Sequence, residues 1–327
     1  MWWILLLLAL GILMYLSSLP VSYRVSRSIV IAKPVHIVFD YVRDVRHSLD
    51  WSPWSLHDPE AVMTFERPTE IGGGYDWSSS KIGQGELVHD AFTEHSLIEQ
   101  TLTFISPFKS IAQIVWEFTP KGEGCEVRWT MDAKVPVFMA PIRPMMKRMI
   151  GFDFELGLAR MRGQLDPSSE HPELGFDGKV ILPAQTYVAE RFSGTLTKMR
   201  EVMQTAYPRL WQTISADTER WEHKPAIAAY HKVKPSQGTV VMDMGFAVKS
   251  IKAGERGLKL AAGQYFQMTM RGSYQFLPCA WNTIQGQVRM QKLKIDKSRP
   301  ALEIYQTNPM EAQSSNDWVT LLCVPIK

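Results

Sequence analysis

Cysteine is scarce in this 327-residue chain, which has only Cys125, Cys279 and Cys323. Their number is odd and they are widely spaced, so neither a disulfide framework nor a zinc site is expected. The formal net charge of +3 is too small to indicate a nucleic-acid partner. We therefore expect no metal, no cofactor and no nucleic acid.

The sequence also lacks the spacing motifs of common catalytic sites. Its histidines show no HExxH pattern, and the glycines of IGGGYDW do not follow a strand and open a helix, as a phosphate-binding loop requires. No nucleophile is recognisable beside an orienting base. If the chain is an enzyme, its catalytic residues leave no motif.

Charged residues are absent from the first 23 positions, where WWILLLLALGILMYLSSL covers residues 2–19. As a helix this run is about 27 Å long, which just spans a bilayer. No basic residue precedes it, unlike in a cleaved signal peptide, so we expect a retained transmembrane anchor over residues 1–23. Arg24 and the basic residues after it favour the cytoplasmic side of an inner membrane, although a folded domain can translocate despite its charge.

The chain length suggests two domains, at roughly 100–200 residues each. Residues 24–166 begin with YRVSRSIVIA, which is typical of a strand, and KPVHIVFDYVRDV, whose apolar spacing predicts a helix. Short strand-like segments follow, and GFDFELGLARMRGQL carries a helical apolar stripe. The predicted order is strand, helix, an antiparallel meander and a long helix.

That order, with SRSIVIAKPVHIVFDYVRDV, DWSPWSLHDPE, GGGYDWSS and GQGEL, resembles the polyketide cyclase/dehydrase and lipid transport superfamily, the START-related (SRPBCC) helix-grip fold. The resemblance implies a curved antiparallel sheet that grips the long helix, with an apolar cavity between them. Trp51, Trp54, Trp77 and Trp116 would line this cavity or simply fill the core, and both interpretations stay open.

Residues 167–179 are rich in Pro, Ser, Gly and charge, which predicts a linker. The second domain, residues 180–327, contains an internal repeat, because PAIAAY at 225–230 recurs as PALEIY at 300–305. The segments around Tyr187 and Tyr265 are similarly related. We therefore expect a duplicated β-α-β-β unit, and an α+β fold for the whole chain.

The second copy of the repeat carries a carboxylate that the first copy lacks. Glu303 stands where the first copy has Ala228, whereas the tyrosine is kept as Tyr230 and Tyr305. In a strand, Glu303 and Tyr305 share one face. A symmetric structural role would not need the acid in one copy only, which favours ligand binding over the alternative of an exposed, salt-bridged glutamate.

The segments GQYFQMTMRGSYQFLPCAWNTI, PALEIYQTNP and WVTLLCVPIK resemble the gyrase-inhibitor-like small-molecule-binding domain, also known as the effector-binding domain of AraC-type and MerR-type activators. The resemblance implies that the strand glutamate, Glu303 by position, lies in a ligand pocket beside aromatic side chains. We expect these to be Tyr305, Trp281, Tyr230 and Tyr265. One carboxylate among aromatic rings suits an amphipathic cation.

The leading hypothesis is a membrane-anchored protein that binds small hydrophobic or amphipathic molecules, as a sensor or by sequestering them. The alternative is a hydrolase or cyclase-type enzyme in which Glu303 acts as base or nucleophile and Tyr305 as proton donor. Nothing before Val180 is typical of a DNA-binding helix-turn-helix, so regulation of transcription would need a partner.

Overall fold

The computed structural model describes residue 3 and residues 19–217, 219–222, 224–308 and 311–327. The predicted membrane anchor falls mainly on residues outside this described part, while Pro20 begins the first strand. Among the described residues, no helix is long and apolar enough to cross a membrane. The chain divides into two compact units, Met1–His171 and Pro172–Lys327, which are treated separately below.

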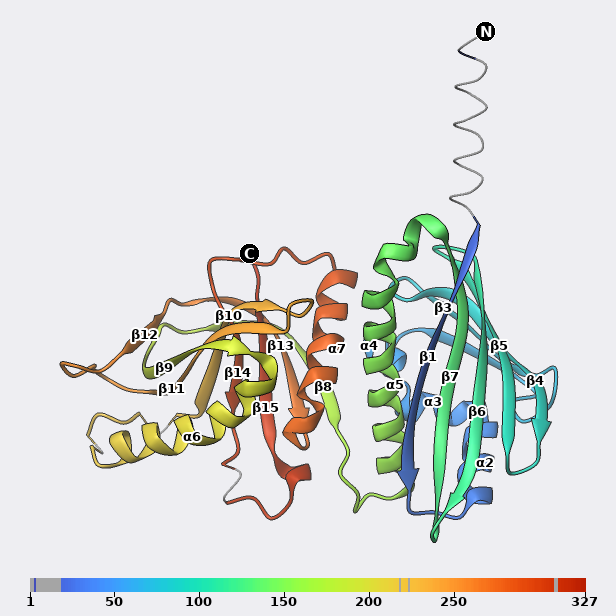
Figure 1. Cartoon of the computed structure of the whole chain (residues 1–327), viewed down its shortest axis with the longest axis horizontal. Coiled ribbons are helices and arrows are strands. Elements are labelled where there is room, and N and C mark those ends of the chain that lie inside the picture. Colours follow the sequence, from blue (N-terminus) through green and yellow to red (C-terminus); the bar gives the residue numbers. More distant parts are fainter. Residues whose placement is uncertain (1–2, 4–18, 218, 223, 309–310) are drawn as a thin grey trace. The chain divides into compact units, whose positions relative to one another are not determined.

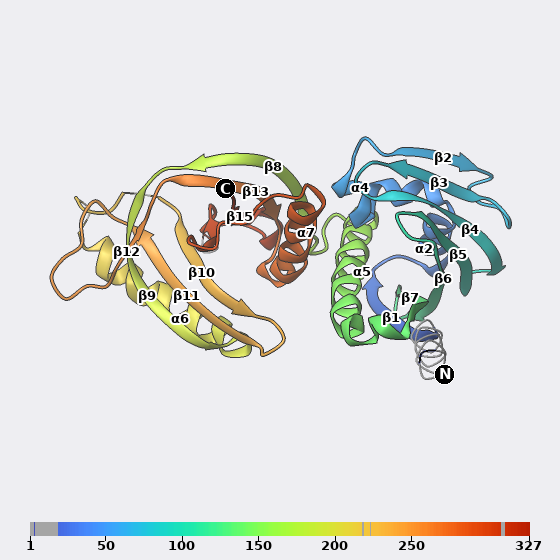
Figure 2. The same ribbon diagram turned by 90° about the horizontal axis from the view of Figure 1, so that it is seen from above.

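The N-terminal unit is built on a seven-stranded antiparallel sheet in the order β1-β7-β6-β5-β4-β3-β2. Its strands are β1 (Pro20–Ile31), β2 (Val62–Glu66), β3 (Gly74–Ser79), β4 (Gly83–Thr93), β5 (Leu97–Ser106), β6 (Ser110–Lys121) and β7 (Gly124–Pro136). Its helices are α2 (Val35–Arg43), η1 (Val45–His47), α3 (Ser48–Trp51), α4 (Pro53–His57), η2 (Val137–Ile142) and α5 (Arg143–Leu165). The sheet curls around α2 and α5 (Figure 2).

The long helix α5 begins at Arg143, eight residues before the segment that was predicted to be helical. Pro144 lies in its first turn, where the missing backbone N–H breaks no helical hydrogen bond, so the proline-rich start is compatible with a helix. Phe154, Leu158 and Met161 are buried, as the apolar stripe predicted. The ring of Phe154 stacks on Trp129 with centroids 3.8 Å apart, which joins the helix to the sheet.

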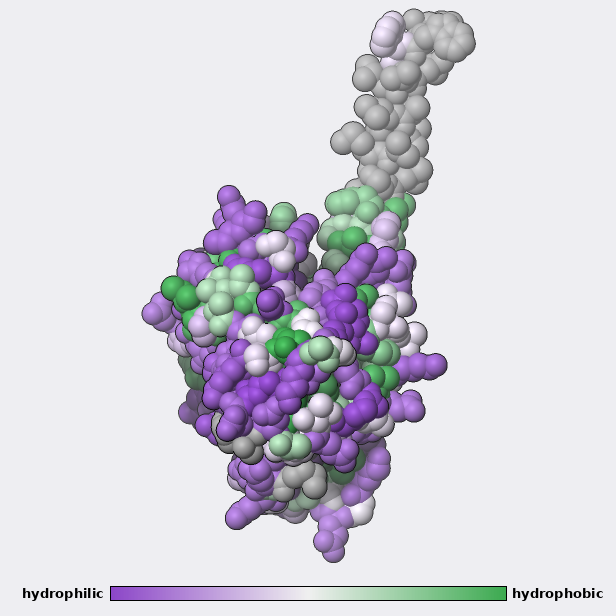
Figure 3. All heavy atoms as spheres, turned by 90° about the vertical axis from the view of Figure 1, so that its left-hand side faces the viewer, coloured by the Kyte–Doolittle hydropathy of each residue, from purple (hydrophilic) through white to green (hydrophobic). Residues whose placement is uncertain are grey.

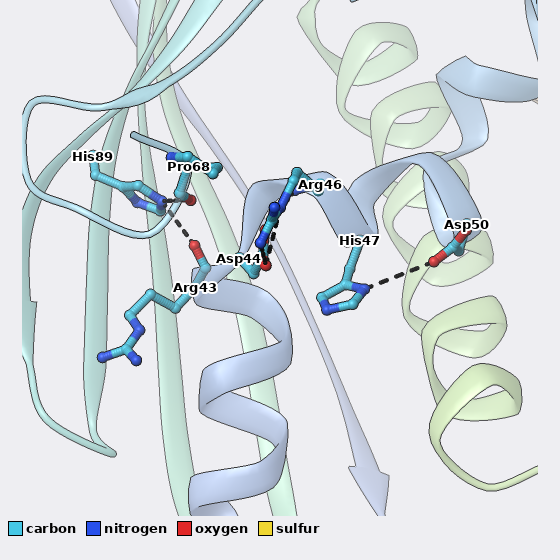
Figure 4. A network of polar contacts seen from close by, with 7 residues as sticks. All are labelled: Arg43, Asp44, Arg46, His47, Asp50, Pro68 and His89. Atoms are coloured by element: carbon cyan, nitrogen blue, oxygen red, sulfur yellow. Dashed lines mark hydrogen bonds and ion pairs between the residues drawn. The ribbon is translucent and has the colours of Figure 1, made fainter. Parts of the chain in front are cut away.

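A buried hydrogen-bond chain crosses the same sheet. Trp116 Nε1 donates to Gln100 Oε1 at 3.0 Å, and Gln100 Nε2 lies 3.2 Å from His89 Nδ1. His89 Nε2 lies 2.9 Å from the carbonyl of Arg43 and 3.3 Å from that of Pro68 (Figure 4). Because carbonyl oxygens only accept, Nε2 carries the proton and Nδ1 accepts from the amide. His89 is therefore held as the neutral imidazole.

The C-terminal unit contains an eight-stranded sheet in the order β12-β9-β11-β10-β14-β15-β13-β8 (Figure 1). Its strands are β8 (Glu173–Leu182), β9 (Gln185–Thr195), β10 (Ala226–Lys234), β11 (Thr239–Ala247), β12 (Gly257–Leu260), β13 (Gly263–Arg271), β14 (Ala301–Tyr305) and β15 (Val319–Pro325). Its helices are α6 (Leu196–Ser215), η3 (Tyr274–Phe276), α7 (Leu277–Met290) and η4 (Ser315–Asp317).

The order of these strands is that of a duplicated unit. Each half runs strand, helix, strand, strand, as β9-α6-β10-β11 and as β13-α7-β14-β15. An additional strand precedes each half and pairs with the other half, because β8 lies beside β13 and β12 beside β9. Strand β8 begins at Glu173, within the segment that the composition had indicated to be a linker.

We expect the N-terminal unit to lose stability as the pH falls from neutrality. Burial lowers the pKa of His89 below its ordinary value of 6.5, so the unfolded chain binds a proton that the folded chain does not. The free energy of unfolding should therefore decrease as the pH drops through 6.5 towards the lowered pKa of His89. Hydrogen exchange of the β5 and β6 amides, measured against pH, checks this expectation.

His89→Asn provides the comparison for this measurement. The variant should be less stable at every pH, because the buried groups around position 89 lose good partners, and its stability should vary less between neutral and mildly acidic pH. An unchanged pH profile in His89→Asn would show that another group is responsible.

Candidate functional site

The candidate site is built around Glu303, in the middle of β14. In the sheet Glu303 pairs with Ala228 of β10 and with Leu322 of β15. Ala228 packs in the apolar cluster under α6 and Leu322 in the cluster under α7, so the carboxyl side chain lies on the helix-covered face between these two cores. Figure 1 shows β14 between α6 and α7.

Three aromatic side chains donate hydrogen bonds to the Glu303 carboxylate. Trp281 Nε1 lies 2.6 Å from Oε1, while the hydroxyls of Tyr230 and Tyr305 lie 2.9 Å and 2.5 Å from Oε2. Glu303 is only 2% exposed, whereas the three donors are partly buried. The structure thus brings together Glu303, Tyr305, Trp281 and Tyr230, four of the five residues predicted for this site, and the exposed, salt-bridged glutamate of the alternative is not observed.

Burial governs the protonation of this group. Desolvation raises the pKa of Glu303 above its ordinary value of 4.5, although the hydrogen bonds from Tyr305, Trp281 and Tyr230 act in the opposite direction. The pKa values of Tyr230 and Tyr305 lie well above 10, because burial and the nearby carboxylate both disfavour a phenolate. The tyrosines therefore remain donors, and the site carries at most the single negative charge of Glu303.

The position of Ala228 explains why the repeat has only one acid. The equivalent residues of the two copies, Ala228 and Glu303, lie directly opposite each other in antiparallel strands. An acid at both positions would place two buried carboxylates side by side, which like-charge repulsion disfavours. The equivalent Tyr230 and Tyr305 instead approach the single carboxylate from both sides, so one acid serves both copies of the repeat.

Tyr265, the fifth predicted residue, does not lie beside Glu303. Tyr265 pairs with Pro325, and Cys323, two residues earlier on the same face of β15, pairs with Leu302. Side chains that pair across strands share a face, so Tyr265 points with Leu302 and away from Glu303. Its ring lies 5.0 Å from the guanidinium of Arg299.

Three further aromatic residues extend the site beyond those predicted. The ring of Tyr305 contacts Tyr207 of α6 and Tyr274 of η3, with centroids 5.8 Å and 5.4 Å away. Tyr274 in turn contacts Trp318, at 4.7 Å. Tyr207 follows Met203 by four residues, which is helical spacing, and this periodicity is the sequence signal that could have identified it.

In the N-terminal unit, three of the four tryptophans predicted to line a cavity gather around Trp129. The ring centroid of Trp129 lies 5.4 Å from that of Trp51, 5.9 Å from Trp54 and 4.5 Å from Trp116. Within the part of the chain that the structure describes, the indole N–H groups of Trp51 and Trp129 are buried without a hydrogen-bond partner. Contact with a ligand there stays a prediction.

Trp77 lies apart from this group. Its ring packs edge-on against Phe104 with centroids 5.6 Å apart, and it covers Gly85 on the neighbouring strand. A Cβ atom at position 85 would lie 2.2 Å from the Trp77 ring, so the glycine makes room for the indole. Separately, no group of three or more potential metal ligands occurs among the described residues.

Fold and site together define a two-domain protein whose two halves are of small-molecule-binding type. Residues 22–166 match the family model for polyketide cyclase/dehydrase and lipid transport, and residues 179–327 match that for the GyrI-like small-molecule-binding domain. Each half of the chain therefore matches one of the two family models, which confirms both resemblances predicted from the sequence. No curated protein matches the chain.

Solved structures with similar folds include protein MLL2253 from Mesorhizobium loti, with 13% identity, a TM-score of 0.36, and coverage of 45% of this chain and 99% of that one. SAV2435 bound to tetraphenylphosphonium has 14% identity, a TM-score of 0.37, and coverage of 46% and 93%. CalU16 from Micromonospora echinospora has 10% identity, a TM-score of 0.31, and coverage of 46% and 87%. At these values the likenesses carry no functional argument.

We expect Trp281→Phe to raise the pKa of Glu303 further, because the substitution keeps an aromatic ring but removes one of the three donors that stabilise the carboxylate. At a pH where Glu303 is ionised, the variant should unfold more easily by about 1–3 kcal/mol, the usual effect of removing a hydrogen bond to a charged group. Denaturant unfolding as a function of pH, and NMR titration of the Glu303 carboxyl carbon, measure both effects.

Tyr274→Phe is the matched control, since Tyr274 is held by ring contacts and its hydroxyl does not bond to Glu303. In the wild type, proton linkage fixes the direction in which stability changes with pH. The raised pKa of Glu303 means that the folded chain holds this proton more tightly than the unfolded chain does. Stability should therefore fall as the pH rises above 4.5 through the pKa of the folded state. If Trp281→Phe and Tyr274→Phe titrate alike, the indole has no influence on Glu303.

Proposed function

We propose that the C-terminal unit is a receptor for amphipathic cations and that Glu303 supplies the counter-charge. The single observation that carries this proposal is a buried carboxylate that receives three hydrogen bonds from aromatic side chains. Its partners among the described residues are all neutral donors, so a cationic ligand would provide a balancing positive charge. Buried carboxylates are otherwise costly unless they are paired.

The surrounding rings suit the apolar part of such a ligand. Tyr207, Tyr230, Tyr274, Tyr305 and Trp281 are each partly buried, which leaves ring surface for contact. Aromatic faces attract a cation through their quadrupole, and their area favours a flat or bulky hydrophobic group. Selectivity would then combine one charge with a hydrophobic shape, as expected of a site that binds several lipophilic cations.

The wider biological role follows from joining this receptor to a helix-grip domain and an apolar N-terminus. We propose a protein anchored in the inner membrane by the apolar run that precedes β1, with both domains on the cytoplasmic side. The helix-grip domain would take an apolar ligand near Trp51, Trp54 and Trp116. Sensing or sequestering lipophilic compounds would use both domains.

We expect the full chain to bind tetraphenylphosphonium and Glu303→Gln to bind it at least about 30-fold more weakly. A buried charge pair contributes on the order of 2–5 kcal/mol, and each factor of ten in affinity corresponds to about 1.4 kcal/mol. The affinity of the wild type should fall as the pH decreases, because protonation removes the counter-charge. Isothermal titration calorimetry at several pH values measures both.

Two controls separate charge from fold in this experiment. Glu173→Gln removes an exposed acid of β8 and should leave the affinity unchanged. A neutral compound of similar size should bind wild type and Glu303→Gln alike. Equal binding of the cation by wild type and Glu303→Gln would contradict the proposal.

A second candidate function, a hydrolase, is favoured by the 2.5 Å contact between the Tyr305 hydroxyl and Glu303 Oε2. So short a contact suits proton transfer, with Glu303 as base or nucleophile and Tyr305 as proton donor to the leaving group. We expect such an enzyme to turn over activated esters or strained rings, with kcat reduced in Glu303→Gln and in Tyr305→Phe. A panel of such substrates, with products followed by mass spectrometry, decides between a catalyst and a receptor that returns its ligands unchanged.

A further inference from the structure

Three separate segments of the N-terminal unit meet at one end of its sheet. β1 begins there at Pro20, which pairs with Pro136 at the end of β7, and the Val137 amide donates to the Leu19 carbonyl at 2.9 Å. The β5–β6 hairpin turns at the same end, because β6 runs antiparallel to β7 and begins at Ser110. Figure 1 shows this end of the sheet beside the first turn of α5.

This end exposes a concentration of large apolar side chains, which we call the entry surface. The most exposed are Phe108 at 81%, Phe138 at 66%, Ile111 at 62% and Met145 at 56%. Four more, Leu19, Ile105, Val137 and Ile142, are between 39% and 47% exposed. Single exposed apolar residues are ordinary, but a gathering of eight at one end of a sheet indicates an interaction site. Figure 3 shows hydrophobic residues around the first described part of β1.

The two segments that supply most of the entry surface carry charges of one sign. Residues 100–116 and 133–152, which supply seven of its eight side chains, contain no Asp or Glu, and the first acid of the whole chain is Asp40. The same two segments contain five basic residues, namely Lys109, Lys134, Arg143, Lys147 and Arg148. Apolar tips surrounded by Lys and Arg are typical of proteins that bind the interface of a bilayer.

We propose that the entry surface docks on a bilayer containing anionic lipid. Phe108 and Phe138 would enter the boundary between headgroups and acyl chains, while each nearby basic residue would contribute on the order of 1 kcal/mol by attraction to anionic headgroups. The apolar run of residues 2–19 leads directly into this surface at Leu19, which places it where a bilayer would be. The proposal does not depend on the ligand of the C-terminal unit.

A second copy of the chain is a poorer partner for the entry surface. A symmetric dimer through this surface would bring five basic residues of one protomer against the same five of the other, with no acid from these segments to compensate. Lysine is also depleted at the buried core of protein interfaces. A bilayer with anionic headgroups satisfies both the apolar and the basic side chains.

The test places a probe on the full chain reconstituted in nanodiscs of phosphatidylcholine with phosphatidylglycerol. Phe108→Cys carries an environment-sensitive fluorophore at the β5–β6 turn, and the native cysteines are buried. Glu123→Cys is the matched control, because it lies at the β6–β7 turn at the opposite end of the 12-residue strand β6, about 40 Å away. Quenching by spin-labelled lipid reports contact with the bilayer.

We expect quenching at position 108 to exceed that at position 123 several-fold. Lys147→Glu combined with Arg148→Glu, or pure phosphatidylcholine, should reduce quenching at position 108 without affecting position 123. No quenching at 108, or equal quenching at both positions, would overturn the proposal, because a tether alone does not orient the unit. A dimeric mass together with a shielded but unquenched probe would assign the surface to a second copy instead.

Discussion

The antiparallel pairing of β10 with β14 is the interaction on which the C-terminal unit depends. It joins the two copies of the repeat at the middle of the sheet and sets Ala228 opposite Glu303. This register brings Tyr230 and Tyr305 to the same carboxylate. It also places the site between α6 and α7. A shift of one residue would turn Glu303 to the face of Leu302, away from Tyr230 and Trp281.

The two units satisfy their buried polar groups in different ways. In the N-terminal unit, the chain from Trp116 through Gln100 to His89 ends on backbone carbonyls, so every member has a partner and the network is complete. Around Glu303 the donors are also in place, yet the charge itself has no cationic partner among the residues that the structure describes. The first arrangement serves stability, whereas the second leaves one electrostatic requirement for a ligand to meet.

Membrane contact, as proposed, would fix the orientation of the N-terminal unit relative to the bilayer. The apolar N-terminal run leads at Leu19 into the start of β1, and the rest of the entry surface lies at that same end of the sheet, so tethering and docking would act at the same place. A tether confines the protein near the bilayer and raises the effective concentration of a surface that is only weakly attracted by itself. Lipophilic compounds partition into bilayers, so a receptor held at that interface would meet them where they are concentrated.

The sequence by itself determined the two domains, their families, the strand and helix order, and the acid as the exceptional residue of a repeat. These follow from local periodicity and from comparison of residues within the chain, and neither requires distant contacts. The tertiary structure decided which aromatic residues surround Glu303. Tyr207 and Tyr274 join the site from separate elements, and Tyr265 is excluded because the strand register turns it to the other face. Which side chains of different strands share a face of the sheet depends on the pairing of strands that are distant in sequence. No single segment carries that information.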